Sequence, residues 1–444
     1  MKKKIYTLVA SIVLSFILVG FSSCSKSDPE PVKKDDDKKE EPVDDSSSAT
    51  ILAELFRNSY RVYEMQRNGI GIYRDSKLFS GSDYHPASVA NIGVGLVSLC
   101  VADKMGWITD AQQQAITTLK TVLNKNTSFH LDVNSAGFPR HFVNMETGER
   151  AWESEYSTVD AALMVSGALF CKKYFSQNTT IASLADELYK SIDWSKAIAN
   201  PETGAIYLSL DANGNGIGTT AVYNEYMLVA HLAYMAENGA GGPATTLWNK
   251  FYANPANLPQ SNYWGYPVLT YNPGSFLSGF IPQFCYYFCH PFGANSQYNT
   301  FMVNAMQSDK KWWTFTPGLS AYEWGMGAGS GTDGYHADKI NENTGKVVSP
   351  HIISGFIPVN STSADDLVNM YKANKGIYTL PGTSYKILWR YSVSNTSWRA
   401  TEVQGIDFST MLFGLASLPE NCGTSFFSDN NNYNFPAYKF EPRQ

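Results

Sequence analysis

Strongly apolar and amphipathic helical patterns alternate along most of this 444-residue chain, and this alternation constrains the fold more than any other feature. About eleven such segments lie between residue 49 and the C-terminus, separated by long loops rich in Gly, Asn, Trp and Pro. A helix that is apolar all round must be buried on every side, whereas an amphipathic helix buries one face. The pattern therefore predicts an all-α fold with a few short strands, an (α/α)6 toroid in which an outer ring wraps an inner ring of apolar helices. No repeat of fixed period is visible, so the prediction rests on the number and length of the helices. An α-solenoid is the alternative.

The local patterns place each predicted element. Helices are expected at 50–68, 87–105, 110–123, 157–174, 181–192, 223–238, 244–252, 279–288, 296–308, 364–374 and 406–418. Short strands are expected at 138–144, 204–210 and 346–351. Gly93 and Gly95 inside the second helix indicate close contact with another helix, and Asp110 is placed to cap the third.

The chain begins with the pattern of an export signal. Lys2, Lys3 and Lys4 precede an apolar run at 5–21 that is shorter than a comfortable membrane span. The small residues before Cys24 resemble the lipobox of bacterial lipoproteins. This resemblance implies that residues 1–23 are a signal peptide and that Cys24 is lipidated.

Residues 24–48 have the composition of a spacer. They are rich in Asp, Glu, Lys, Pro and Ser and contain no aromatic residue, which predicts a disordered acidic linker. We therefore expect one folded domain over 49–444, lipid-anchored to the outer membrane on its periplasmic or surface face.

Charge and composition favour a glycan partner. The net charge is −6 and no Lys/Arg cluster stands outside the leader, which argues against binding of nucleic acid. Aromatic residues make up 14% of the chain, and the flat faces of Tyr and Trp match the apolar C–H face of a sugar ring. We expect a monomer that acts on an oligo- or polysaccharide without a cofactor.

Two patterns resemble metal sites but lack the full ligand set. Cys285, Cys289 and His290 stand close together in an apolar segment, and His290 is kept only as a candidate substrate-binding residue. Asp211–Gly216 matches the first half of a calcium-binding loop, but its twelfth position is Val222 and not Glu. No metal is therefore expected. The five cysteines after Cys24 are odd in number and are expected to be buried apolar side chains: Cys100, Cys171, Cys285, Cys289 and Cys422.

Two acidic residues lie where a solvated carboxylate is unexpected. Glu225 follows a Gly/Asn-rich loop near the start of an apolar helix, where burial would raise its pKa as a general acid requires. The alternative is a first-turn Glu favoured by the helix dipole. Asp160 enters an apolar run, and in a continuous helix Glu153, Ser157 and Asp160 would share one face. The alternative is capping by Ser157 with structural hydrogen bonding by Asp160.

Two further segments are candidates for a site. Asp407 opens the last apolar helix, either as a helix cap or as a second carboxylate. A glycine-rich loop runs from Trp324 through Asp333 to Tyr335, and its aromatic residues are typical of a substrate-binding loop.

These segments resemble the glucoamylase-like family of bacterial glycoside hydrolases, which includes the endo-β-1,2-glucanases. The matching stretches occur in the family's order and span roughly 250 residues: Ser157–Leu163, Tyr223–Glu225, Trp324–Gly325 with Asp333–Tyr335, Val348–Pro350 and Gly405–Asp407. The resemblance implies an (α/α)6 toroid and inverting hydrolysis of a glucan, with β-1,2-glucan as the expected substrate.

The resemblance also implies roles for single residues. Glu225, in the Tyr-Asn-Glu motif, corresponds to the general acid, and Asp407, in the Gly-Ile-Asp motif, corresponds to the carboxylate on the water side. The expected substrate-binding residues are Glu153, Asp160, Trp324, Asp333, Tyr335, Tyr223 and His290.

The chain departs from the family pattern at three motifs. Gly-Ile-Asp is followed by Phe408–Ser409 and not by Gln-Gly, and Gly329–Thr332 stands before Asp333 in place of the commoner Ser-Asp-Gly-Pro. The endo-β-1,2-glucanases carry Asp-Leu-Val-Glu-Thr where this chain has Ser157–Ala161, so one acid is lost and another is shortened. This departure keeps two alternatives open, a glycan-binding lipoprotein without catalysis and a hydrolase of another linkage. A polysaccharide lyase is disfavoured because such enzymes need a basic cleft for uronic acids and this chain is acidic.

Overall fold

Six inner helices alternate with six outer helical segments over the described residues 46–81, 85–433 and 438–443. In this computed structural model the inner helices are α2 (Val89–Lys104), α4 (Thr158–Tyr174), α6 (Met227–Glu237), α8 (Phe280–Phe288), α11 (Pro350–Gly355) and α13 (Gly405–Ala416). The outer segments are α1 (Ser48–Gln66), α3 (Ala111–Val122), α5 (Thr179–Lys190), α7 (Pro243–Leu247) with the π-helical turn η2 (Trp248–Tyr252), α10 (Ser296–Trp313) and α12 (Ser363–Lys372).

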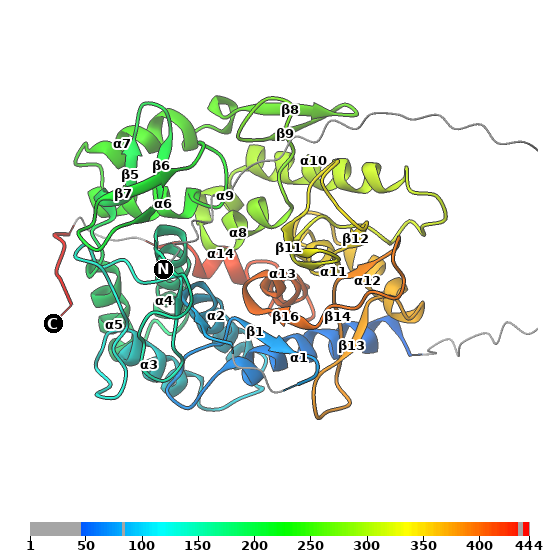
Figure 1. Cartoon of the computed structure of the whole chain (residues 1–444), viewed down its shortest axis with the longest axis horizontal. Coiled ribbons are helices and arrows are strands. Elements are labelled where there is room, and N and C mark those ends of the chain that lie inside the picture. The colour runs from blue at the N-terminus through cyan, green and yellow to red at the C-terminus, as the bar shows by residue number, and fades with distance from the viewer. Residues whose placement is uncertain (1–45, 82–84, 434–437, 444) are drawn as a thin grey trace, which may run out of the picture. The chain divides into compact units, whose positions relative to one another are not determined.

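This arrangement is the predicted (α/α)6 toroid. Each inner helix contacts the next inner helix along the chain, and α13 contacts α2, so the inner ring closes. The outer ring closes where α12 packs against α1. Figure 1 shows α13, α8 and α2 near the centre and α1, α5, α7, α10 and α12 around them. The signal peptide, Cys24 and nearly all of the predicted linker lie outside the described residues.

The burial of each ring follows its sequence pattern. Every residue of α2 from Val89 to Ala102 is buried, as expected of a helix without a polar face. In contrast, the outer helix α5 buries one stripe that includes Ile181, Leu184 and Leu188. Shorter helices fill gaps around the rings: η1 (Trp194–Ala197), η3 (Pro255–Asn257), α9 (His290–Ala294) and α14 (Phe426–Asn430).

Short antiparallel strands connect the helices. The pairs are β1 (Ser76–Leu78) with β16 (Glu402–Gln404), β2 (Ala87–Ser88) with β3 (Phe142–Val143), β8 (Gln260–Tyr263) with β9 (Tyr266–Leu269), β10 (Ala328–Gly331) with β11 (Gly334–Ala337), β12 (Val347–Val348) with β15 (Tyr391–Ser392), and β13 (Ile377–Thr379) with β14 (Lys386–Leu388). In a separate sheet, β6 (Ala205–Leu210) pairs with β4 (Tyr156–Ser157), β5 (Ile198–Asn200) and β7 (Gly216–Thr219).

Glycines let the inner helices approach closely, as Gly93 and Gly95 predicted. A Cβ placed on Gly93 would stand 2.8 Å from the Cα of Met164 on α4. A Cβ on Gly167 would stand 2.6 Å from the Cα of Gly93, so the two helices cross backbone to backbone. The ring of Tyr73 occupies the space beside Gly95.

The sequence prediction missed the helix that completes the inner ring. Residues 346–351 were expected to form a strand, but the strand β12 ends at Val348 and α11 begins at Pro350. Proline suits the first position of a helix because its missing N–H has no partner there in any case. Only six residues long, α11 is too short for helical periodicity to be recognised.

Two helix starts also differ from the prediction. The helix expected from Tyr223 begins at Met227, and residues 223–226 form turns. Asp110 precedes α3, but its carboxylate accepts a hydrogen bond from the side chain of Gln114 at 2.9 Å and does not cap the backbone.

All five cysteines in the described residues are buried and free, as predicted. No contact between them was predicted, yet Cys100 on α2 and Cys171 on α4 meet with their sulfur atoms 3.4 Å apart. No helix among the described residues is long and apolar enough to cross a membrane.

We predict that Gly93→Ala destabilises the protein because the new Cβ would press on backbone atoms of α4 that cannot rotate away. Overpacking of this kind costs about 1–3 kcal/mol, and we expect the upper end of that range. The measurement is the free energy of unfolding in urea.

Gly69→Ala is the matched control, because a Cβ at Gly69 meets nothing within 4 Å. This variant should keep the stability of the parent protein or gain up to about 1 kcal/mol. Equal stability of the two variants would contradict the inferred backbone contact at Gly93.

Candidate functional site

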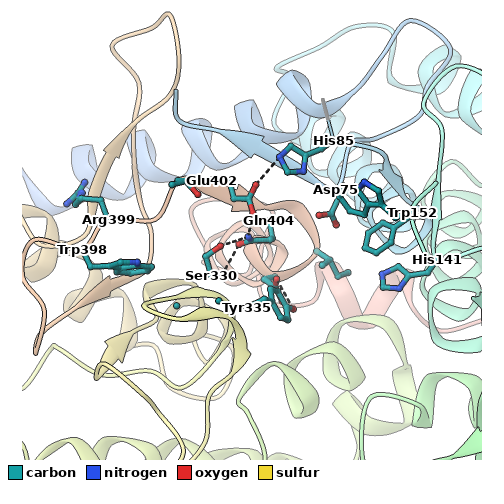
Figure 2. Close-up of a pocket in the computed structure, with 16 residues that line it drawn as sticks. Asp75, His85, His141, Trp152, Ser330, Tyr335, Trp398, Arg399, Glu402 and Gln404 are labelled. Carbon is teal, nitrogen blue, oxygen red and sulfur yellow. Dashed lines mark hydrogen bonds and ion pairs between the residues drawn. The ribbon is translucent and has the colours of Figure 1, made fainter. Parts of the chain in front are cut away.

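The loops that precede four inner helices meet around one cavity of about 670 Å³. The lining comes from the loops before α2, α4, α11 and α13, so the N-terminal ends of these helices point to the same end of the ring. Figure 2 shows polar side chains across its floor, with Trp152 and His141 on one side and Trp398 and Arg399 on the other. Helix N-termini favour negative charge, which suits a site built around carboxylates.

Asp407 lies at the floor of this cavity in the first turn of α13. The start of the helix is fixed because the hydroxyl of Tyr63 donates to the carbonyl of Gly405 at 2.8 Å. Burial raises the pKa of Asp407 to about 7, although the Arg390 guanidinium and a hydrogen bond from Tyr335 favour its charged form. The Asp407 carboxyl can therefore hold or release a proton near neutral pH.

Tyr335 reaches Asp407 from the hairpin β10–β11. Its ring is 59% exposed, but its hydroxyl lies 3.1 Å from each carboxylate oxygen of Asp407. The hairpin rests on a buried ion pair between Arg390 and Asp338, and Arg390 also donates to the carbonyl of Gly327 at 3.0 Å. Because the pair has no access to solvent, it holds the hairpin in a defined position over the cavity.

A chain of polar contacts links His85, Glu402, Gln404 and Ser330 across the cavity (Figure 2). His85 lies 3.1 Å from Glu402, and Gln404 donates to Glu402 at 2.9 Å and to Ser330 at 2.6 Å. Glu402 and Gln404 share one face of β16, since side chains alternate along a strand. Asp75 lies near them, and burial raises the pKa of its carboxyl.

His141 joins the cavity to the start of α4. Its Nε2 lies 3.7 Å from Asp160, and its Nδ1 lies 3.3 Å from Glu155. Burial opposes the charged imidazolium, but Asp160, Glu155 and Asp75 outweigh it and raise the pKa of His141 to about 9. The predicted cap is present, since the hydroxyl of Ser157 accepts a hydrogen bond from the Asp160 backbone at 3.2 Å.

Glu225 lies in the turn before α6, beyond the lining of the cavity. Burial raises the pKa of its carboxyl, and the charge of Asp160 raises it further. Counted around the closed inner ring, α6 and α13 are opposite members, so Glu225 and Asp407 approach the ring's end from opposite sides.

Aromatic side chains form the walls of the cavity. Trp152 is 57% exposed, and Phe142 packs against it with ring centroids 5.0 Å apart. The ring of His141 stacks on Phe142 at 3.8 Å. Trp398 lines the cavity on the other side. Flat rings on two sides of a polar floor match a ligand with apolar faces and a polar rim.

Two predicted substrate-binding residues lie elsewhere. Glu153 was expected on the Asp160 face of a helix, but the helix begins only at Thr158, and the exposed carboxylate of Glu153 pairs with Arg150 at 3.1 Å. Trp324 is buried in the core, where its indole N–H donates to Asp366 at 2.8 Å.

Three more predicted residues do not line the cavity. Tyr223 is buried beneath the start of α6. His290 begins α9 and lies 3.1 Å from the carbonyl of Ser428. Asp333 sits at the exposed tip of the β10–β11 hairpin and binds His336 at 2.8 Å. Of the predicted set, the cavity includes Tyr335 and Asp407, with Asp160 behind His141.

The remaining polar residues of the cavity were missed from sequence. One signal was available, because Glu402 and Gln404 stand at alternate positions just before the Gly405–Asp407 motif. Asp75, His85 and His141 lie between the predicted helices, without a local pattern that marks them.

The calcium-like segment has another role. Asp211 accepts hydrogen bonds from the backbone of Asn213 and Asn215 at 2.9 and 2.8 Å, which stabilises the turn between β6 and β7. Within the described part of the chain, no three His, Cys, Asp or Glu side chains are grouped in a way that could hold a metal ion.

The sequence matches no family model and no curated protein at a significant level. Among solved structures, the chain is similar to a proposed glucoamylase from Bacteroides uniformis, with a TM-score of 0.73 and 18% identity over 88% of this chain and 95% of that one. It is also similar to an endo-β-1,2-glucanase from Chitinophaga pinensis in complex with sophorotriose and glucose, with a TM-score of 0.71 and 16% identity over 87% and 97%. An endo-β-1,2-glucanase from Talaromyces funiculosus gives a TM-score of 0.58 and 13% identity over 90% and 95%. At these identities, the likeness establishes a shared toroid fold.

We predict that Asp160→Asn lowers the pKa of His141 from about 9, because the Asp160 charge contributes most among the groups that raise it. The measurement is an NMR titration of the histidine Cε1–H signals. In the control Asp333→Asn, which removes the partner of His336, the His141 titration should be unchanged. A His141 that still titrates near pH 9 without Asp160 would contradict the inferred pairing.

Proposed function

We propose that this protein is a glycoside hydrolase that cleaves a glucan by an inverting acid–base mechanism. The observation that carries the proposal is Asp407, a buried carboxyl with a pKa of about 7 at the floor of a cavity with aromatic walls. Hydrolysis of a glycosidic bond needs one carboxylic acid and one carboxylate, and burial tunes a carboxyl for such a role.

In the proposed reaction, Glu225 is the general acid and Asp407 the general base. Burial and the charge of Asp160 raise the pKa of Glu225, which favours the protonated carboxyl that donates its proton to the leaving oxygen. The ionised Asp407 accepts a proton from water, which attacks the anomeric carbon on the opposite face of the sugar ring. An inverting enzyme must leave room for that water, with its carboxyl groups roughly 6.5–9.5 Å apart. Placement on opposite inner helices supports such a separation.

The proposed substrate is a β-linked glucan, with β-1,2-glucan as the first candidate. Two of the structurally similar proteins are endo-β-1,2-glucanases, and one of them binds sophorotriose and glucose. The motifs Tyr223–Glu225 and Gly405–Asp407 support the same class. The altered segment Ser157–Ala161 places Asp160 beside His141 and Glu155, where it acts through the charge of this group and not as a reacting carboxyl.

We also propose that the protein works as a monomer at the cell envelope. The basic and apolar leader, Cys24 and the acidic segment that follows support a lipid anchor in the outer membrane.

We predict that the protein releases short oligosaccharides from one member of a panel of α- and β-glucans. Glu225→Gln and Asp407→Asn should each lower kcat by about 10²–10⁴-fold, because each amide cannot transfer a proton. The measurement is product analysis by thin-layer chromatography and mass spectrometry. Glu153→Gln is the control with a carboxylate outside the cavity and should retain full activity.

A glycan-binding protein without catalysis would release no product and would bind the same glucan equally well after Glu225→Gln. Product with an unsaturated sugar, detected by absorbance, would instead indicate a lyase. Either result would overturn the proposed hydrolysis.

We predict that kcat/KM falls as the pH drops below about 7, because Asp407 becomes protonated and can no longer accept a proton. The acidic limb of the pH profile therefore reports the pKa of Asp407. The hydrogen bond from Tyr335 favours the charged form, so Tyr335→Phe should raise the pKa and move the limb to higher pH. The charge of Asp75 disfavours that form, so Asp75→Asn should move the limb to lower pH. Shifts of both variants in one direction, or no shift, would exclude Asp407 as the group that titrates.

A further inference from the structure

Two exposed aromatic rings lie together outside the catalytic cavity. Trp264 is 43% exposed at the tip of the β8–β9 hairpin, and Phe315 is 60% exposed just after α10. Their ring centroids are 5.6 Å apart at an interplanar angle of 42°. We call this pair the Trp264–Phe315 platform. Large apolar side chains grouped on a surface mark a place of contact with another molecule more often than single exposed residues do.

The backbone at Trp264 is strained to present this ring. The two-residue loop Trp264–Gly265 joins β8 to β9, and both residues have positive φ, 52° and 92°. Such a turn favours Asn or Asp followed by Gly, because a bulky side chain in the left-handed region costs stability. Of the seven non-glycine residues with positive φ among the described residues, four are Asn, and only Trp152, Trp264 and Lys346 are bulky. Strain retained on the surface indicates a role for the side chain.

Trp152 in the cavity wall is built in the same way. It too has a positive φ, 54°, and is 57% exposed. Trp264 in the platform and Trp152 in the proposed catalytic cavity therefore share a left-handed backbone conformation and an exposed ring.

The hairpin holds Trp264 in a fixed position. β9 packs along α10 (Figure 1), and Asn304 on that helix donates to the carbonyl of Pro267 at 2.8 Å. The hydroxyl of Tyr263 donates to the carbonyl of Gly274 at 3.0 Å, and its ring meets Phe276 edge to face at 5.4 Å. A prepositioned ring loses little entropy when a ligand binds.

The surroundings of the platform are polar. The ammonium of Lys311 lies 5.4 Å from the centroid of the Phe315 ring, and Asn262 is exposed beside the turn. Two rings with polar neighbours match one or two sugar units, with their C–H faces on the rings and their hydroxyls at the rim. They are far smaller than the roughly 1,000 Å² that a specific protein interface needs.

Chain continuity links the platform with the catalytic cavity. Thr316, Pro317 and Gly318 directly follow Phe315 and line a second hollow of about 310 Å³. This hollow shares Trp398 and Arg399 with the cavity that holds Asp407. Linked surface depressions therefore extend from the residues after Phe315 to the proposed catalytic base.

We propose that the Trp264–Phe315 platform is a second binding site for the glucan chain, separate from the cavity in which the chain is cleaved. This inference rests on the proposed function for its ligand class. The platform retains polymeric glucan on the protein surface, whereas a short oligosaccharide occupies the cavity alone.

The test is affinity electrophoresis in gels that contain soluble β-1,2-, β-1,3- or β-1,4-glucan, with every protein carrying Asp407→Asn to prevent hydrolysis. The probe variant is Trp264→Asn with Phe315→Ala. Asn-Gly is the favoured sequence for this turn. The urea unfolding midpoint of the probe variant should therefore equal or exceed that of the parent protein. We expect the parent protein to be retarded by the glucan that the active enzyme cleaves, and the variant to lose at least half of that retardation.

Kinetics provide the second readout. For these measurements Asp407 is intact, and the variant carries only Trp264→Asn and Phe315→Ala. The variant should raise KM for polymeric glucan at least threefold and leave kcat/KM for a trisaccharide unchanged. Ile217→Ala is the matched control, because it removes an aliphatic side chain that is 53% exposed on β7 and should change neither value.

The outcomes separate the second site from the proposed function. Retardation and polymer kinetics equal to the parent protein would overturn the second site while hydrolysis stands. Loss of self-association in size-exclusion chromatography, without a change in glucan binding, would make the platform an interface between copies and would also overturn it. If the parent protein neither cleaves nor binds any glucan, the proposed function fails and the second site fails with it.

Discussion

Close approach between neighbouring inner helices is the constraint on which the site depends. Glycine permits it at several crossings: Gly93 and Gly167 between α2 and α4, Gly414 against the Ser354 carbonyl of α11, and Gly405 against Asn91 of α2. Because these contacts join backbone to backbone or to short side chains, they fix the distance between helices more strictly than flexible side chains would. The positions of the helix starts around the cavity are therefore fixed as well.

The electrostatics of the site follow from the same geometry. Convergent helix starts bring Asp75, Asp160, Glu225 and Asp407 to one end of a ring whose interior is apolar. Burial raises the pKa of each of these carboxyls. His141 partly offsets the effect at Asp75 and Asp160, and Arg390 and Tyr335 do so at Asp407. Burial first, and a few charged or hydrogen-bonded partners second, thus set the ionisation of these carboxyls, and perturbed pKa values of this kind are typical of functional sites.

Patterns within single helices allowed much of the fold to be predicted, because apolar inner helices and amphipathic outer helices differ locally. The site was predicted less completely, since its residues come from loops before four helices and nothing local tells which loops meet. Of the glycine-rich loop predicted to bind substrate, Tyr335 lines the cavity, but Trp324 is buried against Phe356 and donates to Asp366. The predicted helical face shared by Glu153 and Asp160 was wrong for a simpler reason. The strand β4 precedes Thr158, so the helix does not extend back to Glu153.

Closure of the ring joins the two ends of the described domain. β1 pairs with β16, and α1 packs against α12, α13 and α2, so the first helix of the described residues meets most of its partners only after the last helices have been synthesised. Until then the apolar face of α1, with Ile51, Leu55 and Phe56, stays uncovered. Closing such a long loop costs conformational entropy before the contacts add any stability, and this slows folding. A chain that stops before α12 would therefore form not a smaller ring but an open array of helices with two apolar edges, which is a form prone to aggregate.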